Sequence, residues 1–287
     1  MEEKNIKVSV VITAYNVSKY IEKSINSILN QTYKNIELIV VEDCSTDNTL
    51  EIVNKFKDKL KLVKHDTNVG AGLSRRDGIK TSTGDFVLLL DADDWLSSNY
   101  IEQLVKRQKE TDADIVSGGM TTVFESNDRY ETKTFGTICS EGIQKFVDYN
   151  NGKIVFLNNK IVRKSLYDNV EYCDRRYVED TPVIMKLLYY ANKVAYVNDA
   201  GYHYLQRDNS LCHTASPWKH NIFCALCTAE LIEWFKTKEA PYNNLFKLPQ
   251  FINYFKIAQN SKPTNEDMCN NINEYTFCIN YLLNYIH

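Results

Sequence analysis

Short apolar runs alternate with amphipathic segments over the first third of the chain. The runs at 8–15 (VSVVITAY) and 36–43 (IELIVVED) are rich in β-branched residues and end on polar ones, as strands buried on both faces do. Between them, residues 21–29 repeat isoleucine and leucine at helical spacing. This pattern predicts a strand, a helix and a second strand.

The alternation continues as far as residue 91. The predicted elements are, in order, a helix after residue 43, a strand at 59–65, a helix at 72–82 and a strand at 85–91. Ser45, Thr46 or Asp47 is expected to be the N-cap of the first of these helices. A β-α-β-α-β-α-β order predicts an α/β fold with a mostly parallel sheet and right-handed crossovers.

The regular alternation ends near residue 95. We expect a helix at 97–110, a strand at 113–124 that forms a hairpin with 129–135, and a helix at 140–150. Beyond Trp218 the pattern is helical, with breaks near Pro241 and Pro263. The predicted division is therefore two halves of one α/β domain, 1–94 and 95–214, followed by a C-terminal helical region, 215–287.

Composition and charge narrow the classes of function. The chain has 287 residues, 44% of them hydrophobic, which is enough for one large α/β domain with an appendage. A net charge of −3 gives no basic field to hold a nucleic-acid backbone, so no nucleic-acid partner is expected. The sequence shows no signal segment and no apolar run of about 20 residues, and we expect a cytoplasmic protein.

The eight cysteines are scattered, which favours reduced, buried side chains over a disulfide framework. The pair in CALC (224–227) has the spacing of half a zinc or redox site, but no second pair follows it. Core packing is the favoured interpretation of this pair.

Polar residues gather where the predicted strands end. Thr13, Tyr15, Asp43 and Asp91 all fall at carboxyl ends of strands, where open α/β sheets bind their ligands. For Asp43 alone, turn formation or helix capping is an equally simple explanation. For the set of four, a binding site at this rim of the sheet is the favoured hypothesis.

The segment GDFVLLLDADDW (84–95) carries the strongest chemical signal. Asp91 and Asp93 are spaced i, i+2 after an apolar strand, so their carboxylates can share a divalent cation that also bridges phosphate oxygens. The alternative is a solvated turn with helix caps. In the favoured reading, Asp94 forms the turn that carries the chain toward the acceptor side. The position after a buried strand favours the metal hypothesis.

Four motifs, in order, give the chain a family resemblance: VSVVITAYN, VEDCSTDNT, GLSRRDGI and GDFVLLLDADDW. Together they resemble the family 2 glycosyltransferases of the GT-A fold, and the likeness continues to about residue 212 through NNKIVRKSLY, YVEDTPV and GYHYLQRDNSL. The resemblance implies a Rossmann-like central sheet flanked by helices. It also implies inverting transfer of a hexosyl or N-acetylhexosaminyl group from a UDP-sugar to a hydroxyl of a capsule, lipopolysaccharide or teichoic-acid type of surface glycan.

The resemblance also implies a donor site. Its nucleotide-binding positions are Thr13, Ala14, Tyr15, Asp43, Arg75, Arg76, Asp91, Ala92, Asp93 and Arg207. Tyr15 would stack on the base and Asp43 would accept a hydrogen bond from the uracil imide. RRD stands where the family usually has ARN, so either Arg75 or Arg76 could neutralise phosphate charge.

The resemblance implies catalytic and metal roles as well. Asp93 would bind Mn²⁺ or Mg²⁺ on the diphosphate, and Asp91 would hold the ribose or a metal-bound water. His203 is either a further metal ligand or a packed core residue, and both readings stay open. Asp180 would be the general base, with Glu179 orienting the donor sugar or the base, although an aspartate before Pro182 is also an ordinary helix cap.

The expected partners are a nucleotide sugar and a glycan or lipid-linked glycan acceptor. For residues 215–287, a packed helical appendage is favoured over a homodimer contact or a peripheral contact with the membrane. Two other functions are alternatives: a catalytically inactive subunit that binds nucleotide sugars, and a DxD phosphatase. The phosphatase is disfavoured because Trp95 stands where that class has threonine or valine.

Overall fold

The computed structural model describes residues 5–126, 129–172, 180–207 and 217–242. The chain forms two compact units, the first made of residues 1–176 and 186–208 and the second of residues 177–185 and 209–287. The predicted boundary at residue 94 falls inside the first unit.

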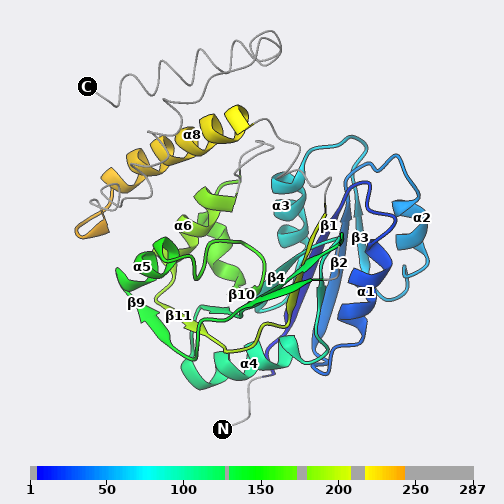
Figure 1. Cartoon of the computed structure of the whole chain (residues 1–287), viewed down its shortest axis with the longest axis horizontal. Helices are drawn as coiled ribbons and strands as arrows, with labels where there is room; N and C mark the ends of the chain where they lie inside the picture. Colours follow the sequence, from blue (N-terminus) through cyan, green and yellow to red (C-terminus); the bar gives the residue numbers. More distant parts are fainter. Residues whose placement is uncertain (1–4, 127–128, 173–179, 208–216, 243–287) are drawn as a thin grey trace. The chain divides into compact units, whose positions relative to one another are not determined.

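An eight-stranded sheet forms the centre of the first unit (Figure 1). Its strands are β1 (Val8–Ala14), β2 (Ile36–Glu42), β3 (Lys61–Lys64), β4 (Phe86–Asp91), β6 (Ile115–Ser117), β9 (Cys139–Glu141), β10 (Lys160–Arg163) and β11 (Lys193–Tyr196). Their order is β3-β2-β1-β4-β10-β6-β11-β9. The first four run parallel, whereas β10 is antiparallel to both β4 and β6. The α/β prediction is confirmed.

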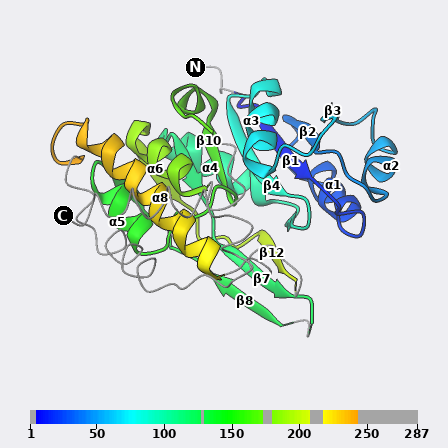
Figure 2. The same cartoon turned by 90° about the horizontal axis from the view of Figure 1, so that it is seen from above.

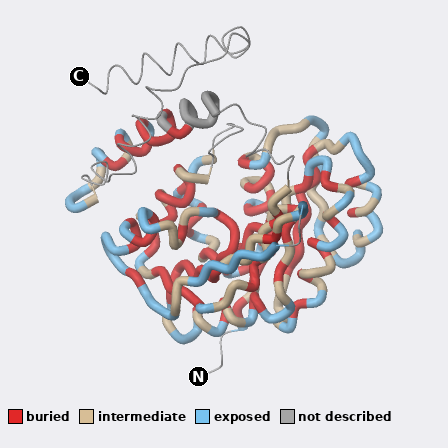
Figure 3. The backbone as a smooth tube through the Cα atoms, viewed as in Figure 1, coloured by how far each residue is buried: buried red, intermediate tan, exposed pale blue. Residues whose placement is uncertain are grey.

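Helices cover both faces of this sheet. They are α1 (Ile21–Leu29), α2 (Thr49–Asn54), α3 (Ala71–Thr81), α4 (Tyr100–Thr111) and α5 (Gln144–Asn150), with a short 3₁₀ helix η1 (Lys164–Asn169). The apolar stripes of α1 and α4 bury against one face of β1, β2 and β4, and those strands are buried almost throughout (Figure 3). Helix α3 lies against the other face, where a Cβ on Gly78 would come within 2.3 Å of the Val11 side chain. Glycine at this position therefore allows the close approach of α3 to the sheet.

A second, four-stranded sheet stands beside the first (Figure 2). It consists of β5 (Trp95–Leu96), β12 (Tyr202–Gln206), β7 (Met120–Phe124) and β8 (Tyr130–Lys133), in that order. The prediction of a single strand at 113–124 is wrong. The chain forms two strands there, because it leaves the large sheet after β6 and enters the small sheet at β7. Gly118 and Gly119 allow this transfer. A Cβ on Gly118 would lie 2.2 Å from the Tyr100 hydroxyl, and a Cβ on Gly119 would lie 2.3 Å from the Lys133 carbonyl oxygen.

Two predicted helix starts need correction. Helix α2 begins at Thr49 after Asn48, not after one of the three residues expected as its N-cap, although Asp47 does accept a hydrogen bond from the Thr49 N–H. Residues 139–141 form β9 at the edge of the large sheet, so α5 starts only at Gln144. In both cases a tertiary contact takes residues that local pattern alone assigned to a helix.

Helices α6 (Asp180–Tyr190) and α8 (Pro217–Lys236) follow later in the chain. Cys224 and Cys227 are buried on α8, in agreement with the core packing expected for CALC. Among the helices that the structure describes, none is long and apolar enough to cross a membrane. The helix break predicted near Pro263 lies outside the described residues. Four of the eight cysteines lie outside them as well.

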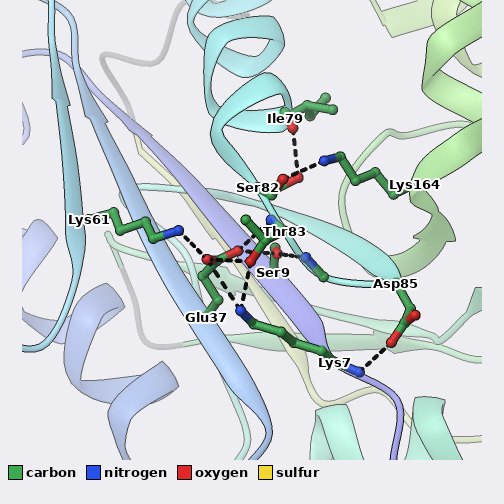
Figure 4. Close-up of polar contacts among 10 residues, drawn as sticks. Lys7, Ser9, Glu37, Lys61, Ile79, Ser82, Thr83, Asp85 and Lys164 are labelled. Carbon is green, nitrogen blue, oxygen red and sulfur yellow. Dashed lines mark hydrogen bonds and ion pairs between the residues drawn. The ribbon is translucent and has the colours of Figure 1, made fainter.

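The amino ends of the parallel strands are joined by a buried carboxylate, Glu37 (Figure 4). It accepts hydrogen bonds from Ser9 Oγ at 2.6 Å, from Lys61 Nζ at 2.5 Å and from both the N–H and the hydroxyl of Thr83. Burial alone would raise the pKa of Glu37, but these donors outweigh it and lower the pKa to about 2. The cluster links β1, β2, β3 and the loop before β4.

Candidate functional site

The carboxyl ends of β1 and β2 carry two loops that are locked together. Asn16 Oδ1 accepts the Thr46 N–H at 2.8 Å, and Asp47 accepts the N–H groups of Ser18 at 3.1 Å and of Thr49 at 2.9 Å. Burial would raise the pKa of Asp47, but its hydrogen bonds lower that pKa to about 2. The locked loops leave the Tyr15 ring 46% exposed at the rim, where a flat ligand ring can stack on it.

Asp43 lies at the end of β2 and is almost fully buried. Its carboxylate accepts hydrogen bonds from His65 Nδ1 at 2.8 Å and from the N–H groups of Val69 and Gly70, each at 2.9 Å. These bonds hold the segment that leads into α3. Hydrogen bonding of Asp43 to a uracil ring stays a prediction, and the observed bonds leave room for about one more donor on a carboxylate.

Asp91 ends β4 directly beside Thr13 of β1, with which it is in register. Arg75 Nη2 on α3 donates to Asp91 Oδ1 at 2.9 Å, and Asn158 Nδ2 donates to Asp91 Oδ2 at 3.2 Å. Arg76 instead pairs with Asp77, with Nε to Oδ1 at 2.8 Å. The structure thus separates the two arginines that the sequence left as alternatives, and it places Arg75 at the rim.

Asp93 follows the buried Ala92 and pairs with Arg207, the residue after β12, with Nη2 to Oδ2 at 2.6 Å. The Arg207 guanidinium also lies over the Tyr20 ring, 5.0 Å from its centroid. Burial raises the pKa of Asp93 and the nearby charge of Asp91 raises it further, against the opposing effect of Arg207. The two predicted metal-binding carboxylates are therefore close enough to repel one another.

Asp94 is fully enclosed and has a structural role. Tyr202 donates its hydroxyl to Asp94 Oδ2 at 2.5 Å, and the Leu205 N–H donates to Oδ1 at 2.8 Å. Burial raises the pKa of Asp94 well above its ordinary value, and Asp91 and Asp93 add to this effect. Asp94 thus fixes β12 of the small sheet against residues 91–94, which we call the aspartate loop.

His203 is held in a stack on the small sheet. Its ring lies parallel to that of Trp95, with centroids 5.2 Å apart, and its Nε2 is 2.9 Å from Ser97 Oγ. Burial lowers the pKa of His203, and the charge of Lys23 lowers it further. Successive residues of a strand point to opposite faces, so His203 points away from the face on which Tyr202 reaches Asp94.

The described residues contain no group of three or more His, Cys, Asp or Glu side chains placed to hold a metal ion. The predicted set of Asp91, Asp93 and His203 therefore does not come together as three protein ligands, and His203 as a ligand stays a prediction. The two aspartates still fit a hard cation, because a pair of mutually repelling carboxylates is stabilised by one. Mg²⁺ sites commonly use one or two carboxylates and take their other ligands from substrate phosphates and water.

Asp180 is the half-buried first residue of α6 and belongs to the second unit, whereas the aspartates of 91–94 belong to the first. Glu179 lies outside the described residues. The roles inferred for Asp180 and Glu179 stay predictions.

Sequence reasoning missed two rim residues. His65 directly follows β3 and bonds Asp43, a position that the strand-end criterion could have selected. Asn158 precedes β10, whose antiparallel entry beside β4 was not foreseen, so no pattern in the sequence placed it next to Asp91.

Comparison with known proteins gives consistent matches. Residues 9–171 match the family model described as glycosyl transferase family 2. Glycosyltransferase GlyG of Streptococcus pneumoniae is 30% identical over 220 residues, covering 72% of this chain and 73% of GlyG. The poly(ribitol-phosphate) beta-N-acetylglucosaminyltransferase TarS of Staphylococcus aureus is 32% identical over 69% of this chain, which spans only 35% of TarS.

Solved structures show the same fold. S. aureus TarS 1–349 in complex with UDP-GlcNAc superimposes with a TM-score of 0.74 and 26% identity, covering 96% of this chain and 82% of that one. A mannosyltransferase from Pyrobaculum calidifontis, solved with GDP-Man and Mn²⁺, shares the fold at a TM-score of 0.59 and 16% identity, over 97% of this chain and 85% of that one. On the family match and the identity to GlyG, this chain belongs to glycosyl transferase family 2.

Proposed function

We propose that this glycosyltransferase moves a sugar, with inversion, from a UDP-sugar to a hydroxyl of a surface glycan, and that it requires Mn²⁺ or Mg²⁺. The observation that carries the proposal is the pair Asp91 and Asp93 at the carboxyl rim of the sheet, where the neighbouring strand β1 is followed by the exposed Tyr15. The relatives support a surface glycan as the acceptor, since TarS acts on poly(ribitol phosphate), and support UDP-GlcNAc as a donor to test first.

The rim carries groups suited to the base and to the diphosphate of such a donor. The Tyr15 ring offers a flat surface to the base, and Arg75 and Arg207 bring positive charge to the neighbourhood of Asp91 and Asp93. A bound Mn²⁺ or Mg²⁺, held by Asp93 with Asp91 nearby, would neutralise the charge that develops on the departing diphosphate.

Inverting transfer also needs a base on the opposite side of the sugar from the leaving group. Asp180 is proposed for this role, in which its carboxylate takes the proton of the attacking acceptor hydroxyl. Glu179 is proposed to orient the donor sugar or the base.

The test is a UDP-release assay with UDP-GlcNAc and other UDP-sugars, with Mn²⁺ or with EDTA, on the wild type and on Asp180→Asn. We expect release that needs the metal ion and falls by about a hundredfold or more in Asp180→Asn, the usual scale for loss of a general base. Asp168→Asn, at an exposed position in η1, is the matched control. Full transfer by folded Asp180→Asn would refute the assignment of the base, and release unaffected by EDTA would refute metal dependence.

A further inference from the structure

The segment before β10 brings an amide side chain to the rim. β10 runs antiparallel to β4, with Val162 opposite Val87 and Arg163 opposite Phe86. Continuing this register toward the start of β10 places Asn158 directly across from Asp91. The hydrogen bond from Asn158 Nδ2 to Asp91 Oδ2 at 3.2 Å agrees with that placement.

A buried lysine fixes this segment. Lys160 is fully buried, and its ammonium group donates to the carbonyl oxygens of Phe156 and Asn158 and to Asn159 Oδ1. Asn159 adopts a left-handed conformation, with φ of 56°, and its carbonyl oxygen accepts the Tyr100 hydroxyl at 2.8 Å. A buried charge and a left-handed asparagine are both costly, and here both serve to hold Asn158 in place.

The orientation of the Asn158 amide is set by its neighbour. Asp91 can only accept hydrogen bonds when ionised, so the NH₂ group of Asn158 faces it and Oδ1 faces away. Asn158 is 9% exposed, and its Oδ1 is buried and accepts no hydrogen bond from any residue that the structure describes. A buried acceptor without a donor is unfavourable, which makes it a place where a ligand can supply one.

The order of the strands indicates which part of a ligand reaches this oxygen. Across the rim, β2 carries Asp43, β1 carries Tyr15 after its end, β4 carries Asp91, and Asn158 comes last. If the base lies at Tyr15 and Asp43, as in the proposed function, Asn158 lies on the far side of the aspartates from the base. We propose that Asn158 Oδ1 accepts a hydrogen bond from a hydroxyl of the transferred sugar, so that Asn158 contributes to donor-sugar recognition. This inference rests on the proposed function.

The experiment compares a nucleotide with and without its sugar. Isothermal titration calorimetry with Mn²⁺ would measure the Kd of UDP and of the UDP-sugar that the wild type binds best among UDP-GlcNAc, UDP-glucose and UDP-galactose. For Asn158→Ala we expect the Kd of the UDP-sugar to rise about fivefold to tenfold, the scale of one hydrogen bond. The Kd of UDP should change less than twofold, because Arg75 still holds Asp91. Asn54→Ala, an exposed asparagine at the end of α2, is the matched control and should change neither value.

The outcomes separate this inference from the proposed function. An equal rise in both Kd values would overturn it, since Asn158 would then act on the nucleotide or only through Asp91, and unchanged values would overturn it as well. If the wild type bound neither UDP nor any UDP-sugar, the proposed function itself would fail. Asn158→Ser, which removes the amide oxygen but leaves a small polar side chain, replaces the alanine variant if that one does not fold. Failure of both to fold would overturn the inference in favour of a structural role.

Discussion

The two ends of the same parallel strands treat their carboxylates in opposite ways. At the amino ends, Glu37 is surrounded by the donors of Ser9, Thr83 and Lys61, and its pKa is lowered to about 2 (Figure 4). At the carboxyl ends, burial and mutual repulsion raise the pKa values of Asp93 and Asp94. At the amino ends the chain itself stabilises the charged carboxylate, whereas at the carboxyl ends the charged forms of Asp93 and Asp94 are disfavoured.

This difference separates scaffold from site. Ion pairs with Arg75 and Arg207 offset only part of the negative charge of the aspartate loop, whereas every oxygen of Glu37 has a donor. A fold gains nothing in stability from bringing carboxylates together unless something outside the chain stabilises them. Perturbed carboxylates of this kind concentrate at functional sites.

The largest expected effect is on the rate of sugar transfer, which should depend on Asp93 at the carboxyl ends of the strands and not on Glu37 at their amino ends. Asp93→Asn should lower the rate of sugar transfer by about a hundredfold to ten-thousandfold, since a bound metal ion supplies several kcal/mol to the transition state and about 1.4 kcal/mol corresponds to tenfold. The rate would be measured as metal-dependent UDP release per folded molecule. Glu37→Gln should keep a rate within about threefold of the wild type once its folded fraction is taken into account.

Asp58→Asn, at an exposed position, is the control for removing one negative charge. Transfer by Asp93→Asn at the wild-type rate would remove the aspartate loop from the catalytic site. A comparable loss in folded Glu37→Gln would show that the two ends are not separate in function.

The second prediction concerns stability, which should depend on Glu37 more than on Asp93. Glu37→Gln should lower the free energy of unfolding by about 2 kcal/mol, because hydrogen bonds to a buried charged group are lost and only neutral ones can replace them. The apparent Tm should fall by roughly 4–8 °C. Asp93→Asn should stay within about 1 kcal/mol of the wild type when measured without metal or nucleotide, because its carboxylate is already disfavoured by burial. Glu51→Gln, exposed on α2, controls for the loss of a glutamate, and a stable Glu37→Gln variant would contradict the scaffold role.

The sign of the Glu37 shift gives a third prediction. The pKa in the folded state, about 2, lies below the ordinary value of 4.5, so the stabilisation is present above pH 4.5 and is lost as the pH falls toward 2. The difference in unfolding free energy between the wild type and Glu37→Gln should therefore be constant from pH 7 to pH 5 and shrink below that. Urea unfolding at a series of pH values measures it. A difference that persists unchanged at pH 3 would show that Glu37 acts through packing and not through its charge.

The first half of the fold could be predicted because its strands and helices are short, regular and consecutive. Each apolar run from residue 8 to residue 91 became a strand in the expected place, and Asp43 and Asp91 fell at the rim because parallel strands all end on one side. The motif order gave the family. These features depend only on residues close in sequence.

The second half depends on contacts that no local pattern encodes. The antiparallel entry of β10 beside β4, which brings Asn158 to Asp91, is fixed by pairing between residues about 70 positions apart. The change of sheet at Gly118 depends on the buried ring of Tyr100. The Glu37 cluster was missed for the same reason, since its donors come from three distant segments and look like ordinary surface residues in the sequence.

The smallest expected effect concerns Asp47, a carboxylate at the rim whose hydrogen bonds are all supplied by the chain itself. Asp47 stands at the carboxyl side of the sheet, yet its pKa is lowered to about 2 by hydrogen bonds that lock the loop after β1, as Glu37 locks the opposite end. Asp47→Ala should raise the Kd of UDP about threefold to tenfold, because Tyr15 loses its fixed position, at a cost of about 1 kcal/mol or less in stability. Calorimetric titration with UDP measures the first and thermal unfolding the second. If UDP binding were unchanged while stability fell, Asp47 would belong wholly to the scaffold, and the site would be confined to the side chains around Asp91.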